Sequence, residues 1–449
     1  MKKFFKITAA ILVLLLIFFV GTFKYRQYKA NRMLIPANAT ALVKINTDQI
    51  YKSIGLNMIS NLGYYLKSGE KKNTKTTATK FDTGLDIPAA ICFYTVEGKS
   101  DHLFFTRLSI KDSVAFKNFI TKTLNLKPAK NFKNETYFAM SADKRLTILY
   151  HKTAVAIACS SGIEDSEQTL INILDQKNFV KISESNFKDL NKYSDHILFT
   201  DQKNIAKLNF NSGNIDFSNE FTSNLQIPAK TVEHRVFNPE NTMNLWLNAK
   251  LGKGENKSLK LKDLNLERDS IAKYYNGYLD VEWTNSTSQI DSVITYDYND
   301  DFEKVEKVTL QKHDVPNLSI NVAANANGLK NYLQQQNFII ADSNVVNKSI
   351  FPLYKLFVSN GPQNLFFSTS KRTKLDLKQE KTTDFFYLNI NFNKVNKQIS
   401  LPFITNFAKS LNKLEAKGKS IGHNKVRIDG KLEFNNKDIN ALYQLLKSF

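Results

Sequence analysis

The stretch ALVKINTDQIYKSIGLNMISNL, residues 41–62, contains the pattern that decides the fold of this chain. Ala41–Asn46 is a short alternating segment, which predicts a strand with one covered face. After Asp48, four apolar side chains recur at helical spacing and predict the apolar face of an amphipathic helix: Ile50, Ile54, Met58 and Leu62.

The same strand–helix unit recurs farther along the chain. Asp112 is a predicted N-cap between the strand Leu103–Ile110 and a helix with Phe116 and Ile120 on its apolar face. Three more units are predicted: Leu318–Val322 before a helix with Leu329, Tyr332 and Leu333; an alternating strand at Phe386–Asn393; and a strand from Val426 to Phe434 before a last helix capped by Asn435 or Asn436.

Hairpins are predicted between these units. Tyr137–Ser141, Leu146–His151 and Val155–Cys159 form a meander, whereas Gly277–Trp283 and Ile290–Tyr298 form a hairpin around the polar loop Thr284–Ser288. Because the strands alternate rather than run solidly apolar, they favour antiparallel sheets with one covered face. We therefore expect an α+β fold: an N-terminal single transmembrane helix, then antiparallel sheets with helices packed on one side, in loosely repeated strand–helix units.

The expected domains follow from where this pattern stops. Weakly periodic, Asn-rich sequence at 209–224 interrupts it. We expect a membrane anchor with basic flanks at 1–32, a first α+β domain at 33–200, a connecting region at 201–240 and a second α+β domain at 241–449.

Residues 4–23, FFKITAAILVLLLIFFVGTF, form the longest apolar run of the chain. At about 1.5 Å per residue, ~20 apolar residues span a bilayer core of about 30 Å. The run ends without a small-residue cleavage site, which favours a retained anchor over a cleaved signal peptide. The basic residues on its two flanks nearly balance, but a short basic tail before one span favours a body outside the cytoplasm. We expect a single-pass protein of the inner (cytoplasmic) membrane with a periplasmic C-terminal body.

The formal net charge is +20, of which seven basic residues lie in 1–32 and leave +13 on the remainder. The lysines and arginines are scattered, which is typical of a solvated surface and also favours anionic lipid as a partner. Zinc-finger spacing and aromatic RNA-binding signatures are missing, so the sequence argues against nucleic acid. Two cysteines in 449 residues exclude a disulfide framework. Cys92 and Cys159 lie in apolar, strand-like runs and are expected to be small buried side chains, with a single bridge open if their strands adjoin.

The sequence nominates no catalytic, cofactor-binding or metal-ligating residue. Asp297, Asn299 and Asp301 have calcium-loop spacing, but Phe302 and Val308 occupy the Gly and Glu places of an EF-hand loop. S-x-x-K occurs at Ser185–Lys188 and Ser368–Lys371 without its partner motifs, and the six histidines are dispersed. Enzymatic activity is therefore not expected.

Two segments resemble uncharacterised membrane-anchored envelope proteins of the Bacteroidota, which are grouped in families of unknown function. They are Met33–Ile50 (MLIPANATALVKINTDQI) and the C-terminal VRIDGKLEFNNKDINALYQLLKSF. The strand–Lys-Asp-Ser–helix step at Ile110–Phe119 is also similar to theirs. The resemblance implies a bacterial envelope protein and transfers no catalytic residue.

Together these observations predict a non-enzymatic, membrane-anchored envelope protein that is an interaction or scaffold component of an envelope complex. Its expected partners are the membrane, through the N-terminal helix, and another envelope protein that docks by strand addition. Two alternatives stay open: a lipid or hydrophobic-ligand transfer protein, and a periplasmic hydrolase without a recognisable motif.

Overall fold

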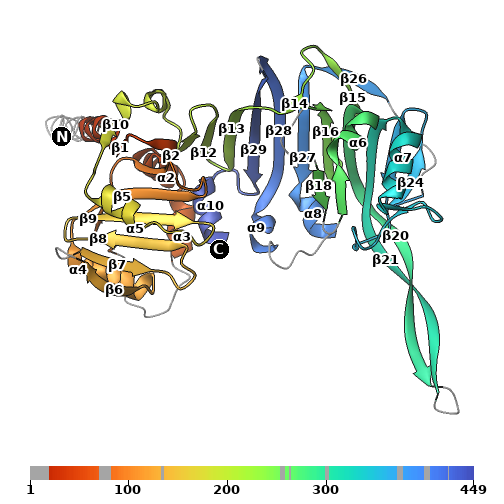
Figure 1. Ribbon diagram of the computed structural model, residues 1–449, viewed down its shortest axis with the longest axis horizontal. Coiled ribbons are helices and arrows are strands. Elements are labelled where there is room, and N and C mark those ends of the chain that lie inside the picture. Colours follow the sequence, from red (N-terminus) through yellow and green to blue (C-terminus); the bar gives the residue numbers. More distant parts are fainter. Residues whose placement is uncertain are drawn as a thin grey trace, which may run out of the picture. The chain divides into compact units, whose positions relative to one another are not determined.

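The computed structural model describes residues 20–69, 82–132, 136–252, 258–261, 264–298, 303–371, 378–398, 405–422 and 424–448. The chain consists of two compact units. Unit 1 comprises Met1–Ser212 and Asp438–Tyr443, and unit 2 comprises Gly213–Lys437 and Gln444–Phe449. Both units are built mainly from antiparallel sheet (Figure 1).

Unit 1 has one principal antiparallel sheet. Its strands are β1 (Leu34–Pro36), β2 (Ala39–Ile45), β3 (Leu85–Asp86), β4 (Ile91–Val96), β5 (Leu103–Ile110), β6 (Lys127–Phe132), β7 (Thr136–Met140), β8 (Leu146–Tyr150), β9 (Ala154–Ser160), β10 (Phe179–Lys181), β11 (Ile197–Thr200) and β12 (Ile205–Phe210). Hydrogen bonding orders them β12–β11–β2–β4–β5–β9–β8–β7–β6. β3 pairs with the end of β5, and β1 pairs with β10.

The helices of unit 1 are short. They are residues 20–30, α2 (Thr47–Ser60), α3 (Leu62–Gly69), α4 (Ser113–Asn118) with a π-helical turn at Phe119–Thr123, α5 (Glu167–Leu174) and 3₁₀ turns at Ile182–Glu184 and Lys188–Lys192. The predicted N-cap is confirmed, because the Asp112 carboxylate accepts hydrogen bonds from the N–H groups of Val114 and Ala115.

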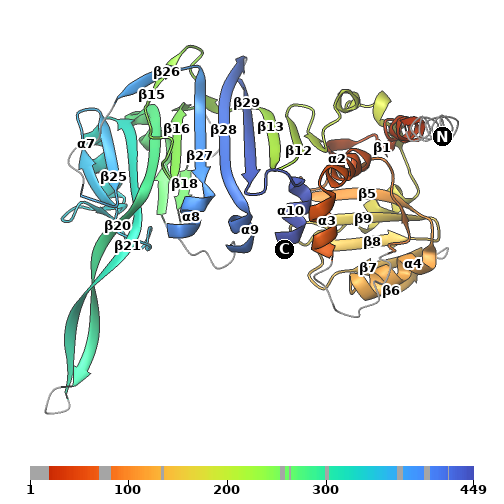
Figure 2. The same cartoon turned by 180° about the vertical axis from the view of Figure 1, so that it is seen from behind.

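Helices cover both faces of the unit 1 sheet, so the predicted packing on one side is wrong. Phe105 of β5 packs with Leu170 of α5, whereas Leu108 of β5 packs with Phe116 of α4. Side chains an odd number of positions apart on a strand point to opposite faces, which places α5 and α4 on opposite sides. Figure 1 shows α5 over one face, and Figure 2 shows α2 and α3 from the other side. The reason is that β5 is apolar on both faces.

Unit 2 is also an antiparallel sheet. Its strands are β13 (Asn214–Thr222), β14 (Leu225–Gln226), β15 (Val232–Arg235), β16 (Met243–Asn248), β17 (Lys250–Leu251), β18 (Ser258–Leu261), β19 (Leu264–Glu267), β20 (Tyr275–Tyr298), β21 (Lys304–Ala324), β22 (Ile339–Ile340), β23 (Val345–Val346), β24 (Phe357–Asn360), β25 (Asn364–Ser368), β26 (Gln379–Thr382), β27 (Asp384–Asn391), β28 (Leu411–Gly422) and β29 (Lys425–Phe434). The main order is β13–β29–β28–β27–β16–β20–β21–β25–β24–β23–β22. β15 pairs with β26 in a separate two-stranded sheet.

Few helices accompany this second sheet. They are α6 (Arg268–Tyr274), α7 (Ala326–Gln335), α8 (Phe392–Gln398), α9 (Thr405–Ser410) and α10 (Ala441–Ser448), of which α10 begins in unit 1. Leu329 and Leu333 of α7 pack with Leu365 of β25 in the main apolar core of the unit. The last helix is capped by Asn440, whose Oδ1 accepts from the N–H of Leu442, and not by the predicted Asn435 or Asn436.

The predicted fold class is wrong on two points: the proportion of strand to helix, and the N-terminal transmembrane helix. Of the residues that the structure describes, 47% are in strands and 25% in helices, so antiparallel sheet dominates. Strand–helix steps occur at β2–α2, β5–α4, β21–α7 and β27–α8, but most strands turn directly into the next strand, as in the confirmed meander β7–β8–β9. Sequence reasoning gave the helical steps too much weight because a capped helix leaves a clearer local signal than a strand.

Residues 1–19, which hold most of the predicted membrane segment, lie outside the described residues. No helix in the described part of the chain combines the length and the apolar content needed to cross a membrane. The predicted transmembrane helix is therefore unsupported as an element of the fold. The helix at 20–30 is fastened to unit 1 instead: Arg26 forms a two-pronged ion pair with Asp48 of α2 (2.8 and 2.9 Å), and Ala30 packs against Ala89 and Ala90.

Candidate functional site

Strands β20 and β21 extend well past the sheet of unit 2 and form a projecting two-stranded ladder (Figure 1). Tyr278–Trp283 of β20 pairs with β16, and Ser319–Ala323 of β21 pairs with β25. Farther out, among the described residues, each of the two strands has only the other as a strand partner. We call Ser286–Tyr298 and Lys304–Pro316 the arm. At about 3.3 Å per residue, it is roughly 40 Å long.

Gln289 fixes the base of the arm to the body of unit 2. Its side chain is buried, and Nε2 donates to the carbonyl oxygens of Lys355 (2.8 Å) and Thr369 (2.7 Å). Its Oε1 accepts from the N–H of Lys355 (2.9 Å). A buried amide with all these bonds made holds two segments in one geometry, so the arm has a defined root.

Asp291 adds an ionic contact just above that root. Lys355 Nζ lies 2.8 Å from its carboxylate, and His313 and Lys348 lie within 3.6 Å. The hydrogen bond from Lys355 lowers the pKa of Asp291, helped by the nearby positive charges and opposed by partial desolvation. The carboxylate is therefore charged at neutral pH.

The arm carries a stripe of apolar side chains on one face. Residues paired directly across an antiparallel ladder share a face, and the register sets Ile294 opposite Val308 and Ser292 opposite Leu310. We call this set the arm stripe: Ile290, Ile294, Tyr296, Val308 and Leu310. Val308 is 62% exposed and Leu310 is 71% exposed. An isolated two-stranded ladder is marginally stable in water, and contiguous exposed apolar surface marks interaction sites, so this face is suited to a covering partner.

The arm is acidic in an otherwise basic chain. Residues 286–316, the arm together with the segment that links its two strands in the sequence, contain seven acidic side chains and three lysines, a net charge of −4, whereas the whole chain carries +20. The acidic side chains are Asp291, Asp297, Asp300, Asp301, Glu303, Glu306 and Asp314. An apolar stripe within acidic surroundings favours a partner whose surface is apolar and positively charged.

Sequence reasoning missed the arm because it placed a turn where the chain continues. The predicted hairpin around Thr284–Ser288 is wrong: β20 runs through that segment as one 24-residue strand, with a register irregularity between Trp283 and Ser286. The polar residues of this segment are typical of a loop, but the segment contains neither Gly nor Pro, the residues that mark turns most strongly. Alternate apolar side chains at 290, 294 and 296 were the available signal.

The most buried charged cluster of unit 2 has a structural role. Arg235 of β15 bonds to Asp280 of β20 through Nη2 (2.7 Å) and Nε (3.2 Å), and to Glu282 through Nη1 (2.8 Å). Asn321 Nδ2 donates to the other oxygen of Asp280, and Asn241 Nδ2 donates to the other oxygen of Glu282. Because both carboxylates are already engaged, they fasten the β15–β26 pair to the sheet rather than serve as a general acid and base.

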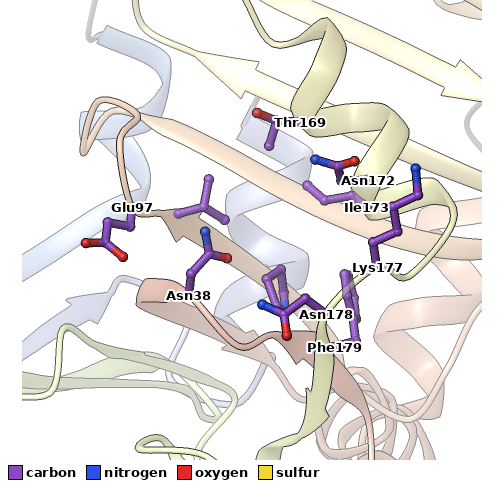
Figure 3. Close-up of a pocket in the computed structure, with 10 residues that line it drawn as sticks. Asn38, Glu97, Thr169, Asn172, Ile173, Lys177, Asn178 and Phe179 are labelled. Carbon is purple, nitrogen blue, oxygen red and sulfur yellow. The ribbon is translucent and has the colours of Figure 1, made fainter.

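Two pockets, one in each unit, are candidate ligand sites. In unit 1 a pocket of about 340 Å³ lies beside α5, and Figure 3 shows Glu97 and Lys177 on opposite sides of it. In unit 2 a pocket of about 230 Å³ is bordered by Arg235, Tyr278 and Asn321. Beside the second pocket the Tyr278 hydroxyl bonds to Asp280, whose carboxylate is also held by Arg235 and Asn321, so this pair belongs to the structural cluster.

The remaining sequence motifs are not assembled into sites. Within the described ranges no group of three or more His, Cys, Asp and Glu side chains could hold a metal ion. The side chains of the calcium-like set Asp297, Asn299 and Asp301 lie outside the described residues. Cys92 and Cys159 are free, and burial raises the pKa of the Cys92 thiol to about 12.

No protein-family model and no curated protein matches this chain. Two solved structures of TP0453 are similar to it at a very low level. Crystal form IV has a TM-score of 0.22 and 9% identity, covering 75% of this chain and 92% of that chain. Crystal form I has a TM-score of 0.21 and 8% identity, covering 76% of this chain and 93% of that chain. At these TM-scores the likeness carries no argument about fold or function, and the resemblance to Bacteroidota envelope proteins stays a prediction.

Proposed function

We propose that this chain is a non-enzymatic interaction protein of the bacterial envelope and that the arm is its docking element for a partner protein. The observation that carries the proposal is the arm stripe: five apolar side chains on one face of a ladder that no other strand supports among the described residues. Envelope placement rests on the sequence, through the apolar N-terminal run and the resemblance.

The chemistry of the arm indicates the kind of partner. Its apolar stripe would pack against an apolar surface, and the net charge of −4 on residues 286–316 would favour basic residues around that surface. The outer edges of both strands also present backbone donors and acceptors, which a partner can engage by adding a strand. We therefore expect a protein with a basic, apolar groove or an exposed strand edge.

The two alternative functions have weaker support. A lipid or hydrophobic-ligand carrier needs an enclosed apolar cavity, whereas the pocket beside α5 is bordered by Asn38, Glu97 and Lys177. A hydrolase needs free titratable groups converging on one point, whereas Asp280 and Glu282 are engaged by Arg235.

The proposal is tested by placing a photo-crosslinking amino acid at position 308 or 309 of the full-length protein in its native membrane. Val308 lies on the arm stripe, and Thr309 is its neighbour on the opposite face of the ladder. We expect one discrete crosslinked protein from position 308 and much less of it from position 309. The double variant Val308→Glu/Leu310→Glu should reduce the amount of that protein that co-purifies at least tenfold, whereas Thr309→Glu should leave it unchanged.

Because Val308, Thr309 and Leu310 are exposed, these variants should unfold at the same urea concentration as the parent chain. Equal crosslinking from both positions, or a partner that survives Val308→Glu/Leu310→Glu, would contradict the proposal. Crosslinking only to other copies of this chain would replace the partner protein by self-association.

A further inference from the structure

The helices α2 and α3 of unit 1 expose apolar side chains at helical spacing. Figure 2 shows both helices on the outside of the unit 1 sheet. We call this set the α2–α3 face: Tyr51, Leu56, Met58, Ile59, Leu62 and Leu66. Ile59 is 70% exposed and Leu66 is 68% exposed. Gly55 and Gly63 have open space where a side chain would be, so nothing among the described atoms packs closely on them.

The inner side of α2 is polar instead. Asn57 is buried, donates to Ser212 Oγ (2.8 Å) and to the carbonyl of Asp438 (2.7 Å), and accepts from the N–H of Asn440 (2.9 Å). Ser53 donates to the carbonyl of Phe210 (3.0 Å). The apolar face predicted from the sequence is only partly buried: Ile50 and Ile54 are half-buried, whereas Met58 and Leu62 are exposed. Hydrogen bonds fix α2 in this orientation, so the exposure is built into the unit.

Basic and aromatic side chains lie next to this face. The described residues 20–69 contain seven Lys and Arg, of which only Lys44 is buried, and a single acidic residue, Asp48, which is paired with Arg26. Lys52 of α2 lies over the ring of Phe23 (5.5 Å), so the helix at 20–30 touches α2 where the face begins. That helix exposes Tyr25 and Tyr28, with Lys29 and Arg32 over their rings (5.1 and 4.8 Å). Tyrosines with lysines or arginines are typical of a lipid–water interface.

We propose that the α2–α3 face binds the surface of an anionic lipid bilayer, with its apolar side chains in the headgroup region and its lysines against lipid phosphates. Apolar side chains on one side of a helix with flanking Lys and Arg are the pattern of helices that lie in the interface plane. A protein partner of the same shape would need to be strongly acidic, whereas phosphatidylglycerol supplies both negative charge and an apolar layer. This site is in unit 1 and does not rest on the proposed function of the arm.

The test measures where residue 59 sits when the full-length protein is reconstituted in lipid vesicles. Ile59→Cys is labelled with a nitroxide in a Cys159→Ser background; Cys92 is buried, with a pKa of about 12, and stays unreactive. The matched control is Ile163→Cys, which is 74% exposed on the loop before α5 of the same unit. Collision rates with oxygen, which partitions into lipid, and with a water-soluble nickel complex are compared at the two positions.

In vesicles of phosphatidylglycerol and phosphatidylethanolamine, we expect residue 59 to favour oxygen over nickel several-fold and residue 163 to favour nickel. In pure phosphatidylcholine, the preference at residue 59 should fall substantially, since the lysines lose their counter-charges. Preference for nickel at residue 59 in the anionic vesicles would overturn the proposal. Protection from both reagents would also overturn it, because protein would then cover the face, and equal immersion in phosphatidylcholine would overturn the assignment to anionic lipid.

Discussion

The arm of unit 2 and the α2–α3 face of unit 1 expose similar apolar side chains in opposite electrostatic surroundings. The arm repeats them with the two-residue period of a strand, within residues 286–316, which carry a net charge of −4. The α2–α3 face repeats them with helical spacing, within the described residues 20–69, which contain seven basic residues and one acidic residue. The charge around an apolar patch, more than its size, separates a protein-docking surface from a lipid-docking surface. Variants that change unit 1 or unit 2 separately can test the comparison between the two surfaces.

The largest effect is expected from removing the buried counter-charge that holds β15–β26 to the unit 2 sheet. Asp280→Ala leaves the buried guanidinium of Arg235 without its main counter-charge. Because an unpaired buried charge is costly, the free energy of unfolding should fall by about 3–5 kcal/mol. Urea unfolding followed by the fluorescence of Trp246 and Trp283, both in unit 2, measures it.

The control for this variant is Glu380→Ala, which removes an exposed carboxylate of β26 that lies 3.3 Å from His234 of β15. It should cost at most about 1 kcal/mol. Equal losses for Asp280→Ala and Glu380→Ala would show that the buried cluster is not what holds β15–β26 to the sheet.

A smaller effect is expected at the root of the arm. Gln289→Ala leaves two carbonyl groups and one N–H without their partner, which should cost about 1–3 kcal/mol. Hydrogen exchange of the arm amides should become faster, because the root no longer fixes the ladder. Gln311→Ala, in the exposed part of the arm, should leave exchange at the root unchanged; faster exchange there in both variants would rule out a specific role for Gln289.

In unit 1 the corresponding test concerns a buried lysine. Lys44 of β2 is 2% exposed, and its Nζ donates to Oδ1 of Asn31 and Asn191. Burial lowers the pKa of Lys44, so the unfolded chain holds this proton more tightly. Stability should therefore rise with pH between the lowered pKa and the ordinary value of about 10.5, and Lys44→Met should remove that rise. Urea unfolding at pH 8 to pH 10.5, followed by circular dichroism, measures it, and the exposed variant Lys52→Met should keep the rise.

The smallest effect is expected at Asp291. Its pKa is lowered, so the stability that it contributes is present above the ordinary Asp value and is lost as the pH falls through the lowered value. Asp291→Asn should remove this acid-dependent part, worth about 0–1 kcal/mol for a partly exposed pair. Unfolding measured from pH 6 down to pH 2 should show it. Asp342→Asn, an exposed substitution in the same unit, should leave the profile as in the parent chain.

The sequence predicted where helices and strands begin better than it predicted which of their sides are buried. The Asp112 cap and the meander β7–β8–β9 were predictable because capping and strand alternation act over a few residues. The orientation of α2 was not, because Asn57 finds its partners at Ser212, Asp438 and Asn440, far along the chain. The arm was hidden for a similar reason: only the register between β20 and β21 brings Ile294 and Val308 to one face.

The ion pair between Arg26 and Asp48 has a mechanical consequence. If a flexible linker replaced the helix at 20–30, its root-mean-square end-to-end distance would be roughly 18 Å, because that distance is about 5–6 Å times the square root of the number of residues. Unit 1 could then move over that distance. The Arg26 guanidinium bonds to both carboxylate oxygens of Asp48, and Ala30 packs against Ala89 and Ala90. These contacts hold the helix at 20–30 in a fixed position on unit 1. A force applied to the chain at residue 20 would therefore be transmitted to α2 through this ion pair. Unit 1 would then rotate together with the helix at 20–30 and not independently of it.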